Sequence, residues 1–67
     1  MENKIRYFRF MHQEMTQQEL ADKVGVTRQT IIAIEKGVFN PSVKLALKMA
    51  KVFGVNVEEI FSLNDAD

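Results

Sequence analysis

Five residues of the segment RQTIIAIEK have side chains suited to contacts with DNA. An α-helix turns by about 100° per residue, so one helix face would carry Arg28, Gln29, Ile32, Ala33 and Lys36. Arginine can donate two hydrogen bonds to guanine, glutamine can pair with adenine, and an aliphatic side chain can contact the thymine methyl group. This face therefore favours contacts in the major groove, with Lys36 at its far end able to reach a phosphate. The alternative for the polar residues is an ordinary solvated surface. For Ile32 it is a contact with a neighbouring loop or a second subunit.

The opposite face of the same segment is apolar. Ile31 and Ile34 fall on one side of the helix and predict that this side packs on the core. Glu35 lies at the edge of that apolar side, where an unpaired carboxylate would be costly. Arg9 is its natural partner, and we expect a partly buried, structural Arg9–Glu35 ion pair that ties the first helix to this one.

The residues before this segment predict a helix and a tight turn that would position it. Thr16 and Glu19 have the spacing of a capping box, in which each satisfies a backbone N–H near the other. Gly25 can end that helix in a left-handed conformation, and Thr27 can cap the next one. Two helices joined by so short a turn form a helix-turn-helix. Gln17 would then start the first of these helices, where it can hydrogen-bond a phosphate.

The rest of the chain has helical periodicity and no strand pattern. Further helices are predicted over residues 3–12, 28–36 and 43–53, and a short fifth one after an N-cap at Asn56. The inward stripe of the fourth is predicted to be Val43, Ala46, Leu47, Ala50 and Phe53. The expected fold is all-α, a compact five-helix domain spanning residues 1–67, with residues 62–67 as a frayed acidic tail.

Charge is distributed unevenly along a chain of zero net charge. Residues 1–54 contain all nine basic residues and five acidic ones, a net charge of +4, whereas residues 55–67 contain four acidic residues and no basic one. The basic part could face an anionic partner. No apolar run approaches the roughly 20 residues of a membrane span, and the charged, aromatic N-terminus does not resemble a signal peptide. With no cysteine, the expected location is the cytoplasm, and no membrane contact is expected.

Catalytic and metal-binding groupings are not apparent. The single histidine, His12, has no cysteine or second histidine to share a metal with. Met11, Met15 and Met49 have the spacing of core residues. The sequence therefore predicts no enzyme activity, no cofactor, no metal and no small-molecule ligand.

The C-terminal region has more apolar residues than one short helix can bury. We expect a homodimer interface among Val55, Val57, Ile60, Phe61 and Leu63, some of which must instead belong to the core. The alternative is that all five pack within one subunit.

The segment MTQQELADKVGVTRQTIIAIEKG, with NPS and ALKMAKVFGVNVEEIF after it, resembles the Xre-type helix-turn-helix regulators, relatives of phage repressors and Cro. The chain departs from the commonest pattern by one extra residue between Arg9 and Gln17, without the usual glycine. The resemblance implies a phage-repressor-like fold, dimers on two-fold operators and repression of transcription. The DNA contacts it implies are Gln17, Thr27, Arg28, Gln29, Thr30, Ile32, Ala33 and Lys36. The alternative function is an antitoxin-type or other protein-interaction module.

Overall fold

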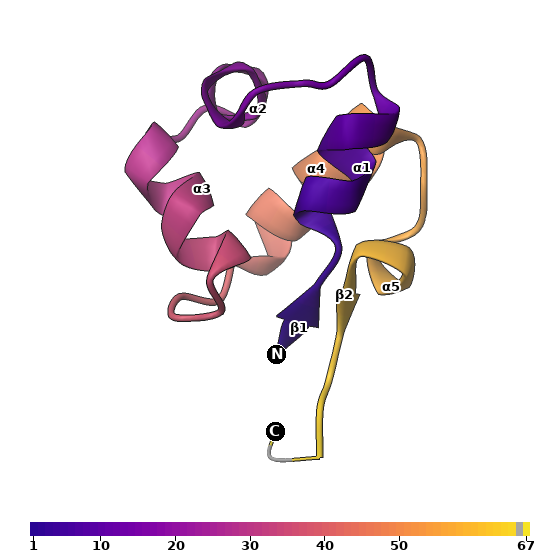
Figure 1. Ribbon diagram of the computed structural model, residues 1–67. Coiled ribbons are helices and arrows are strands. Elements are labelled where there is room, and N and C mark those ends of the chain that lie inside the picture. The colour runs from indigo at the N-terminus through magenta and orange to yellow at the C-terminus, as the bar shows by residue number, and fades with distance from the viewer. Residues whose placement is uncertain (66) are drawn as a thin grey trace.

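The computed structural model describes residues 1–65 and 67, and it is mainly helical (Figure 1). Its helices are α1 (Ile5–Met11), α2 (Gln17–Val24), α3 (Arg28–Glu35), α4 (Val43–Phe53) and α5 (Val57–Ile60), and its strands are β1 (Glu2–Asn3) and β2 (Phe61–Ser62). The five-helix architecture is as the sequence predicts. None of the helices in this described part is long and apolar enough to cross a membrane.

The helix-turn-helix has a capped helix end on each side of its turn. The backbone N–H of Glu19 donates to Thr16 Oγ1 at 3.0 Å, and the N–H of Thr16 donates to Glu19 Oε1 at 3.0 Å. Gly25 ends α2 with φ +75°, a left-handed conformation that glycine adopts without steric cost. Thr27 Oγ1 then accepts from the N–H of Thr30 at 3.3 Å. These caps satisfy backbone groups that the helix ends would otherwise leave open, and so fix where α3 begins.

The core takes side chains from all five helices. The most deeply buried are Ile5, Leu20, Val24, Ile31, Ile34, Met49 and Ile60. Phe8 of α1 stacks on Phe53 of α4, with ring centroids 5.7 Å apart. Helix α2 packs against both α3 and α4, and this packing supports the helix-turn-helix.

The predicted inward face of α4 is partly wrong. Leu45 and Met49 are buried together with the three correctly predicted residues, whereas Val43 is 78% exposed and Leu47 56% exposed. Apolar residues occupy more than half of the circumference of this helix, so the sequence alone did not determine which part would meet the core. The assignment of Met11 to the core is also wrong, because Met11 is exposed.

A two-stranded ribbon joins the two ends of the described chain, which the all-α prediction did not include. Glu2 pairs with Ser62 and Asn3 with Phe61 in antiparallel register, and the N–H of Lys4 donates to the carbonyl of Ile60 at 2.7 Å. Strand pairing explains why α1 begins later than the predicted residue 3. It also corrects the expectation of fraying from residue 62, because the tail begins as a paired strand.

The connection between α1 and α2 is conformationally costly. Gln13 and Glu14 have φ of +59° and +54°, the left-handed region, which disfavours residues with a Cβ atom. This is where the sequence has an extra residue and no glycine. The longer connection thus reverses the chain with two non-glycine residues in left-handed conformations.

We expect Gln13→Gly to raise the free energy of unfolding by about 0.5–1 kcal/mol. Glycine removes the cost of the left-handed conformation, which exceeds the entropy that glycine adds to the unfolded chain. Urea denaturation followed by circular dichroism measures the change. The matched control is Gln18→Gly inside α2, which should lower stability by about 1 kcal/mol. A loss of stability in both variants would contradict the argument.

Candidate nucleic-acid interface

Helix α3 separates its apolar side from its polar side. Ile31 and Ile34 are fully buried against the body of the protein. Arg28, Gln29 and Lys36 are exposed on the other side. This division follows the predicted periodicity and leaves the polar stripe accessible to a partner.

Ile32 lies among these polar residues and outside the buried core. It is partly exposed, as are Thr30 and Ala33, while Thr27 is exposed at the helix N-terminus. An aliphatic side chain that is exposed among polar residues can contact a methyl group of a partner while the helix stays packed on the core. The structure therefore brings together all the predicted contact residues of α3 on an accessible surface.

A hydrogen-bonded network at Glu35 fixes α3 to α1. Arg9 Nε donates to Glu35 Oε2 at 2.7 Å, and Arg9 Nη2 donates to Glu35 Oε1 at 3.0 Å. The side chains are only 13% and 12% exposed. Arg9 Nη1 also donates to the carbonyl of Met15 at 2.8 Å, which links the same guanidinium to the chain just before α2. The predicted ion pair is thus present as a two-pronged contact, the strongest geometry for such a pair.

Gln17 also points toward this network. Its Nε2 donates to Glu35 Oε1 at 3.3 Å, and the residue is partly buried at the start of α2. The sequence predicted a phosphate contact for Gln17, and the observed bond to Glu35 is long. The amide group therefore connects α2 with α3 while remaining next to the N-terminus of α2.

An open hollow of about 530 Å³ adjoins the start of α2. Its lining residues come from α1, α2, α3 and the α1–α2 connection: Arg6, Arg9, Glu14, Met15, Thr16, Gln17, Gln18, Arg28 and Glu35. The guanidinium of Arg9 is paired with Glu35, but those of Arg6 and Arg28 and the positive end of the helix dipole make this region suited to an anion such as a phosphate. Sequence analysis missed Arg6 and Gln18. Arg6 could have been found, because it precedes Arg9 by three residues and so lies on a neighbouring part of the same helix face.

The C-terminal end of α3 has a second anchor that the sequence did not reveal. Asn3 Nδ2 donates to the carbonyl of Ile34 at 2.9 Å, and Gly37 follows with φ +78°. The Ile34 carbonyl also accepts from the backbone N–H of Gly37 at 3.0 Å, so the Asn3 side chain adds a second hydrogen bond at the end of this helix. Because 31 residues separate the two partners, no local pattern could have predicted it.

The predicted dimer residues divide into two groups. Ile60 is 1% exposed and Phe61 7% exposed, both within the core of one subunit, so the structure corrects their assignment to an interface. They are buried because α5 packs on α4 and β2 pairs with β1. Val55 and Val57 are partly buried against the core, while Leu63 is 74% exposed. Sequence analysis could not divide these residues because a core and an interface require the same apolar types.

Glu19 has a lowered pKa because it belongs to the cap of α2. The hydrogen bond from the backbone N–H of Thr16 stabilises the charged carboxylate, and the Thr16 side chain adds to this effect. A lowered pKa in the folded state means that the contribution to stability is present above the unfolded pKa. It is lost as the pH falls through the folded value.

We expect Thr16→Ala to move the Glu19 pKa upward toward its ordinary value. The substitution keeps the backbone N–H but removes the hydroxyl that organises the capping box. Carboxyl chemical shifts followed by NMR during an acid titration measure the change. Ser42→Ala is the control, because it removes the hydroxyl cap of α4 and should leave Glu19 unaffected. Equal Glu19 pKa values in the Thr16 variant and the parent would contradict this account.

Comparison with known proteins defines the class. A helix-turn-helix family model matches residues 5–60, and the chain belongs to this family. It is 58% identical over 65 residues to an uncharacterised HTH-type transcriptional regulator of Methanocaldococcus jannaschii, covering 97% of each chain. It is 45% identical over 65 residues to the uncharacterised HTH-type transcriptional regulator YgzD of Bacillus subtilis, again covering 97% of each chain. The protein is therefore a transcriptional regulator with a helix-turn-helix DNA-binding domain.

Two further likenesses are more distant. The chain is 37% identical over 60 residues to the cryptic phage CTXphi transcriptional repressor RstR of Vibrio cholerae, covering 90% of this chain and 53% of RstR. The crystal structure of the hypothetical transcription factor NHTF from Neisseria matches with a TM-score of 0.73 and 31% identity. That match covers 82% of this chain and 61% of the Neisseria chain, so this chain spans about three fifths of that protein's length.

Proposed function

We propose that this protein is a sequence-specific repressor that places α3 in the major groove of double-stranded DNA. The observation that carries the proposal is the exposed stripe on α3, where Arg28, Gln29 and Lys36 surround a partly exposed Ile32. Two buried isoleucines and the Arg9–Glu35 pair hold this helix rigidly to the body. A rigid helix presenting these side chains matches how base edges are read in the major groove.

The hollow beside α2 supports a second set of contacts. Arg6 and Arg28 could meet phosphates there, with Gln17 and the N-terminus of α2 adding hydrogen bonds. Phosphate contacts fix the register of a protein on DNA, whereas contacts with base edges supply sequence preference. Thr27 and Thr30 at the start of α3 would then lie between the phosphate contacts and the base contacts.

A two-fold operator is part of the proposal. Two copies of a domain that reads a half-site bind with their recognition helices about 34 Å apart on one face of DNA. The protein would act as a cytoplasmic homodimer that represses by occupying the operator. The distant likeness to a phage repressor supports this direction of regulation.

Selection of bound duplexes from a random pool tests the proposal. The expected result is a motif with two-fold symmetry, bound with an affinity that falls steeply as salt is added. Titration of the selected duplex and a scrambled duplex at one salt concentration provides the comparison. Equal affinity for the two duplexes would show that the protein is not sequence-specific.

Ile32 provides a finer prediction about base contacts. In the selected operator, replacing one thymine by uracil removes only the methyl group. We expect this change to weaken binding of the parent protein several-fold at the base pair facing Ile32, and to leave Ile32→Ala unaffected. Fluorescence anisotropy on the four protein–DNA combinations measures the coupling. Equal losses in both proteins at every thymine would exclude a methyl contact by Ile32.

A further inference from the structure

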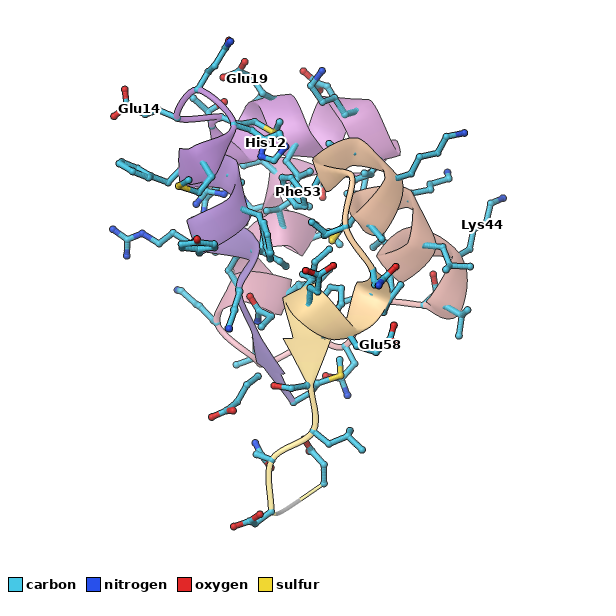
Figure 2. All side chains as sticks on the ribbon, turned by 90° about the vertical axis from the view of Figure 1, so that its right-hand side faces the viewer. His12, Glu14, Glu19, Lys44, Phe53 and Glu58 are labelled. Carbon is cyan, nitrogen blue, oxygen red and sulfur yellow. The ribbon has the colours of Figure 1, made fainter. Side chains whose placement is uncertain are left out.

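The C-terminal end of α3 lies against the β1–β2 ribbon. An open hollow of about 430 Å³ is lined both by residues of the ribbon and by residues 35–37. A Cβ atom at Gly37 would lie 3.8 Å from the carbonyl oxygen of Met1. Figure 1 and Figure 2 show the two strands side by side at one end of the molecule, and in Figure 2 this end is opposite Glu14 and Glu19. The ribbon is thus a neighbour of the end of α3 and lies away from the α1–α2 connection.

Asn3 is a residue of this ribbon whose side chain bonds to α3. Its Nδ2 donates to the carbonyl of Ile34 at 2.9 Å, and its Oδ1 accepts from the backbone N–H of Ile5 at 3.3 Å. An amide group has one donating and one accepting end, so only this orientation of the side chain satisfies both bonds. The backbone of Asn3 is fixed by pairing with Phe61, which is itself buried. Asn3 therefore connects the ribbon to α3 through a side chain with little freedom to move.

The bond from Asn3 differs from the ion pair that also holds this end of α3. Glu35 reaches Arg9 through its side chain, and rotation about the bonds of that side chain lets the helix backbone shift while the ion pair is kept. Asn3 instead holds the backbone itself, at the carbonyl of Ile34. Gly37 donates to the same carbonyl, but it belongs to the same turn and moves with the helix. Asn3 thus restrains a movement of α3 that the ion pair permits.

A shift at this end of α3 would affect one half of the helix more than the other. The N-terminal end is fixed by the cap at Thr27 and by the short turn after α2. A displacement would therefore be smallest at Arg28 and larger at Ile32 and Ala33, which lie farther along the helix. Functional side chains must be held within about 0.5 Å of their productive positions. Even a small movement of the C-terminal half would then weaken its contacts with base edges.

We propose that Asn3 is a positioning residue for sequence recognition. By holding the backbone at Ile34 to the ribbon, it fixes the C-terminal half of α3 relative to the base pairs. This inference rests on the proposed function, because it concerns how α3 reads DNA. Asn3 acts through α3, so the role requires no contact between Asn3 and the DNA.

The variant Asn3→Asp removes the bond to α3 with the smallest change of shape. The carboxylate still accepts from the N–H of Ile5, but an oxygen replaces the nitrogen that donates to Ile34. Ser62→Asp is the matched control, because Ser62 is exposed on the paired strand and lines the same hollow. It adds the same charge and keeps the Asn3 bond. Circular dichroism confirms that both variants are folded.

Hydrogen exchange of the free protein, followed by NMR, tests the restraint without DNA. The N–H groups of Gly37 and Val38 donate to carbonyls at the end of α3. In Asn3→Asp we expect both to exchange at least about fivefold faster, because this end of the helix opens more often. The N–H of Ile31, near the other end, should exchange as in the parent, and Ser62→Asp should change none of the three. Unchanged exchange at Gly37 and Val38 in Asn3→Asp would overturn the proposal.

Replacing the base pairs of the selected half-site one at a time tests the effect on recognition. The preference at each position is the ratio of affinities for the selected and the altered duplex. Asn3→Asp should reduce this ratio at least about threefold at the positions that Ile32→Ala also affects, and keep it within about twofold of the parent at those that Arg28→Ala affects. Ser62→Asp should keep both ratios, even where its charge weakens all duplexes alike. Ratios that are unchanged everywhere, or reduced equally everywhere, would overturn the positioning role.

The two proposals fail in different ways. A parent protein without sequence preference would overturn the proposed function, whereas faster exchange at Gly37 and Val38 in Asn3→Asp would still show that Asn3 restrains α3. A parent protein with a sequence preference that Asn3→Asp fully retains would overturn the positioning role, and the DNA-binding function would stand.

Discussion

Glu35→Ala is expected to lower the free energy of unfolding by about 3 kcal/mol, the largest stability change predicted for a single substitution in this protein. Removing this carboxylate leaves the Arg9 guanidinium, which is 13% exposed, without its charged partner. A largely buried charge that loses its partner costs several kcal/mol. A domain of this size has only about 3–5 kcal/mol of stability to lose, so much of the variant should be unfolded at room temperature.

Thermal and urea unfolding of Glu35→Ala, Arg9→Ala and the double variant measure the effect. Because each single change disrupts the same pair, the double variant should be clearly more stable than the sum of the two losses predicts. Asp22→Ala is the control, since Asp22 is an exposed acid that accepts a hydrogen bond from Gln18, and the cost should stay within about 0.5 kcal/mol. Strict additivity of the Arg9 and Glu35 losses would refute the coupling.

The features that the sequence predicted well are those set by residues close together in the chain. The caps at Thr16 and Thr27 depend on side chains that reach a backbone N–H three residues away. Such contacts form whenever the helix forms, whatever packs on it. The two faces of α3 followed from the helical periodicity, because Ile31 and Ile34 fall on one side of the helix and the polar residues on the other.

The Arg9–Glu35 pair was predictable for a different reason. Its partners are 26 residues apart, but a lone carboxylate at the edge of an apolar face requires a cation, and few cations lay on an inward-facing helix edge. The high cost of an unpaired carboxylate and the small number of available cations thus made this pair predictable, although its two residues are far apart in the chain. The bond between Asn3 and Ile34 had no such requirement visible in the sequence, because any helix C-terminus can be satisfied by water.

The ribbon and the faces of α4 and α5 were not predictable, because they depend on how the elements pack. Each strand is two residues long, too short for an alternating pattern. On α4, apolar residues occupy more of the helix surface than the core covers. The position of the excess, at Val43 and Leu47, became apparent only once Leu45 and Met49 were found in the core.

Arg28→Ala is expected to remove the preference of the protein for one base pair in each half-site. A bidentate arginine–guanine contact contributes about 1–3 kcal/mol of discrimination, so the affinity for the selected site should fall about 5- to 150-fold. For a duplex in which that base pair has already been changed, the affinities of Arg28→Ala and of the parent should be nearly equal. Arg28→Lys is the matched variant, because it keeps the charge but not the planar pair of donors, and it should lose most of the discrimination as well.

Lys36→Ala should behave differently, and the contrast separates contacts with phosphates from contacts with base edges on α3. A residue that contacts phosphate weakens all sequences alike and reduces the salt dependence of binding by about one counterion. Binding isotherms of the parent and the three variants, on matched and mismatched duplexes at several salt concentrations, measure both the sequence preference and the salt dependence.

Arg28 also lines the hollow beside α2, where it could contact a phosphate instead. A uniform loss for Arg28→Ala with a reduced salt dependence, rescued by Arg28→Lys, would place Arg28 on the phosphates. Base recognition would then have to rest on Gln29 and Ile32.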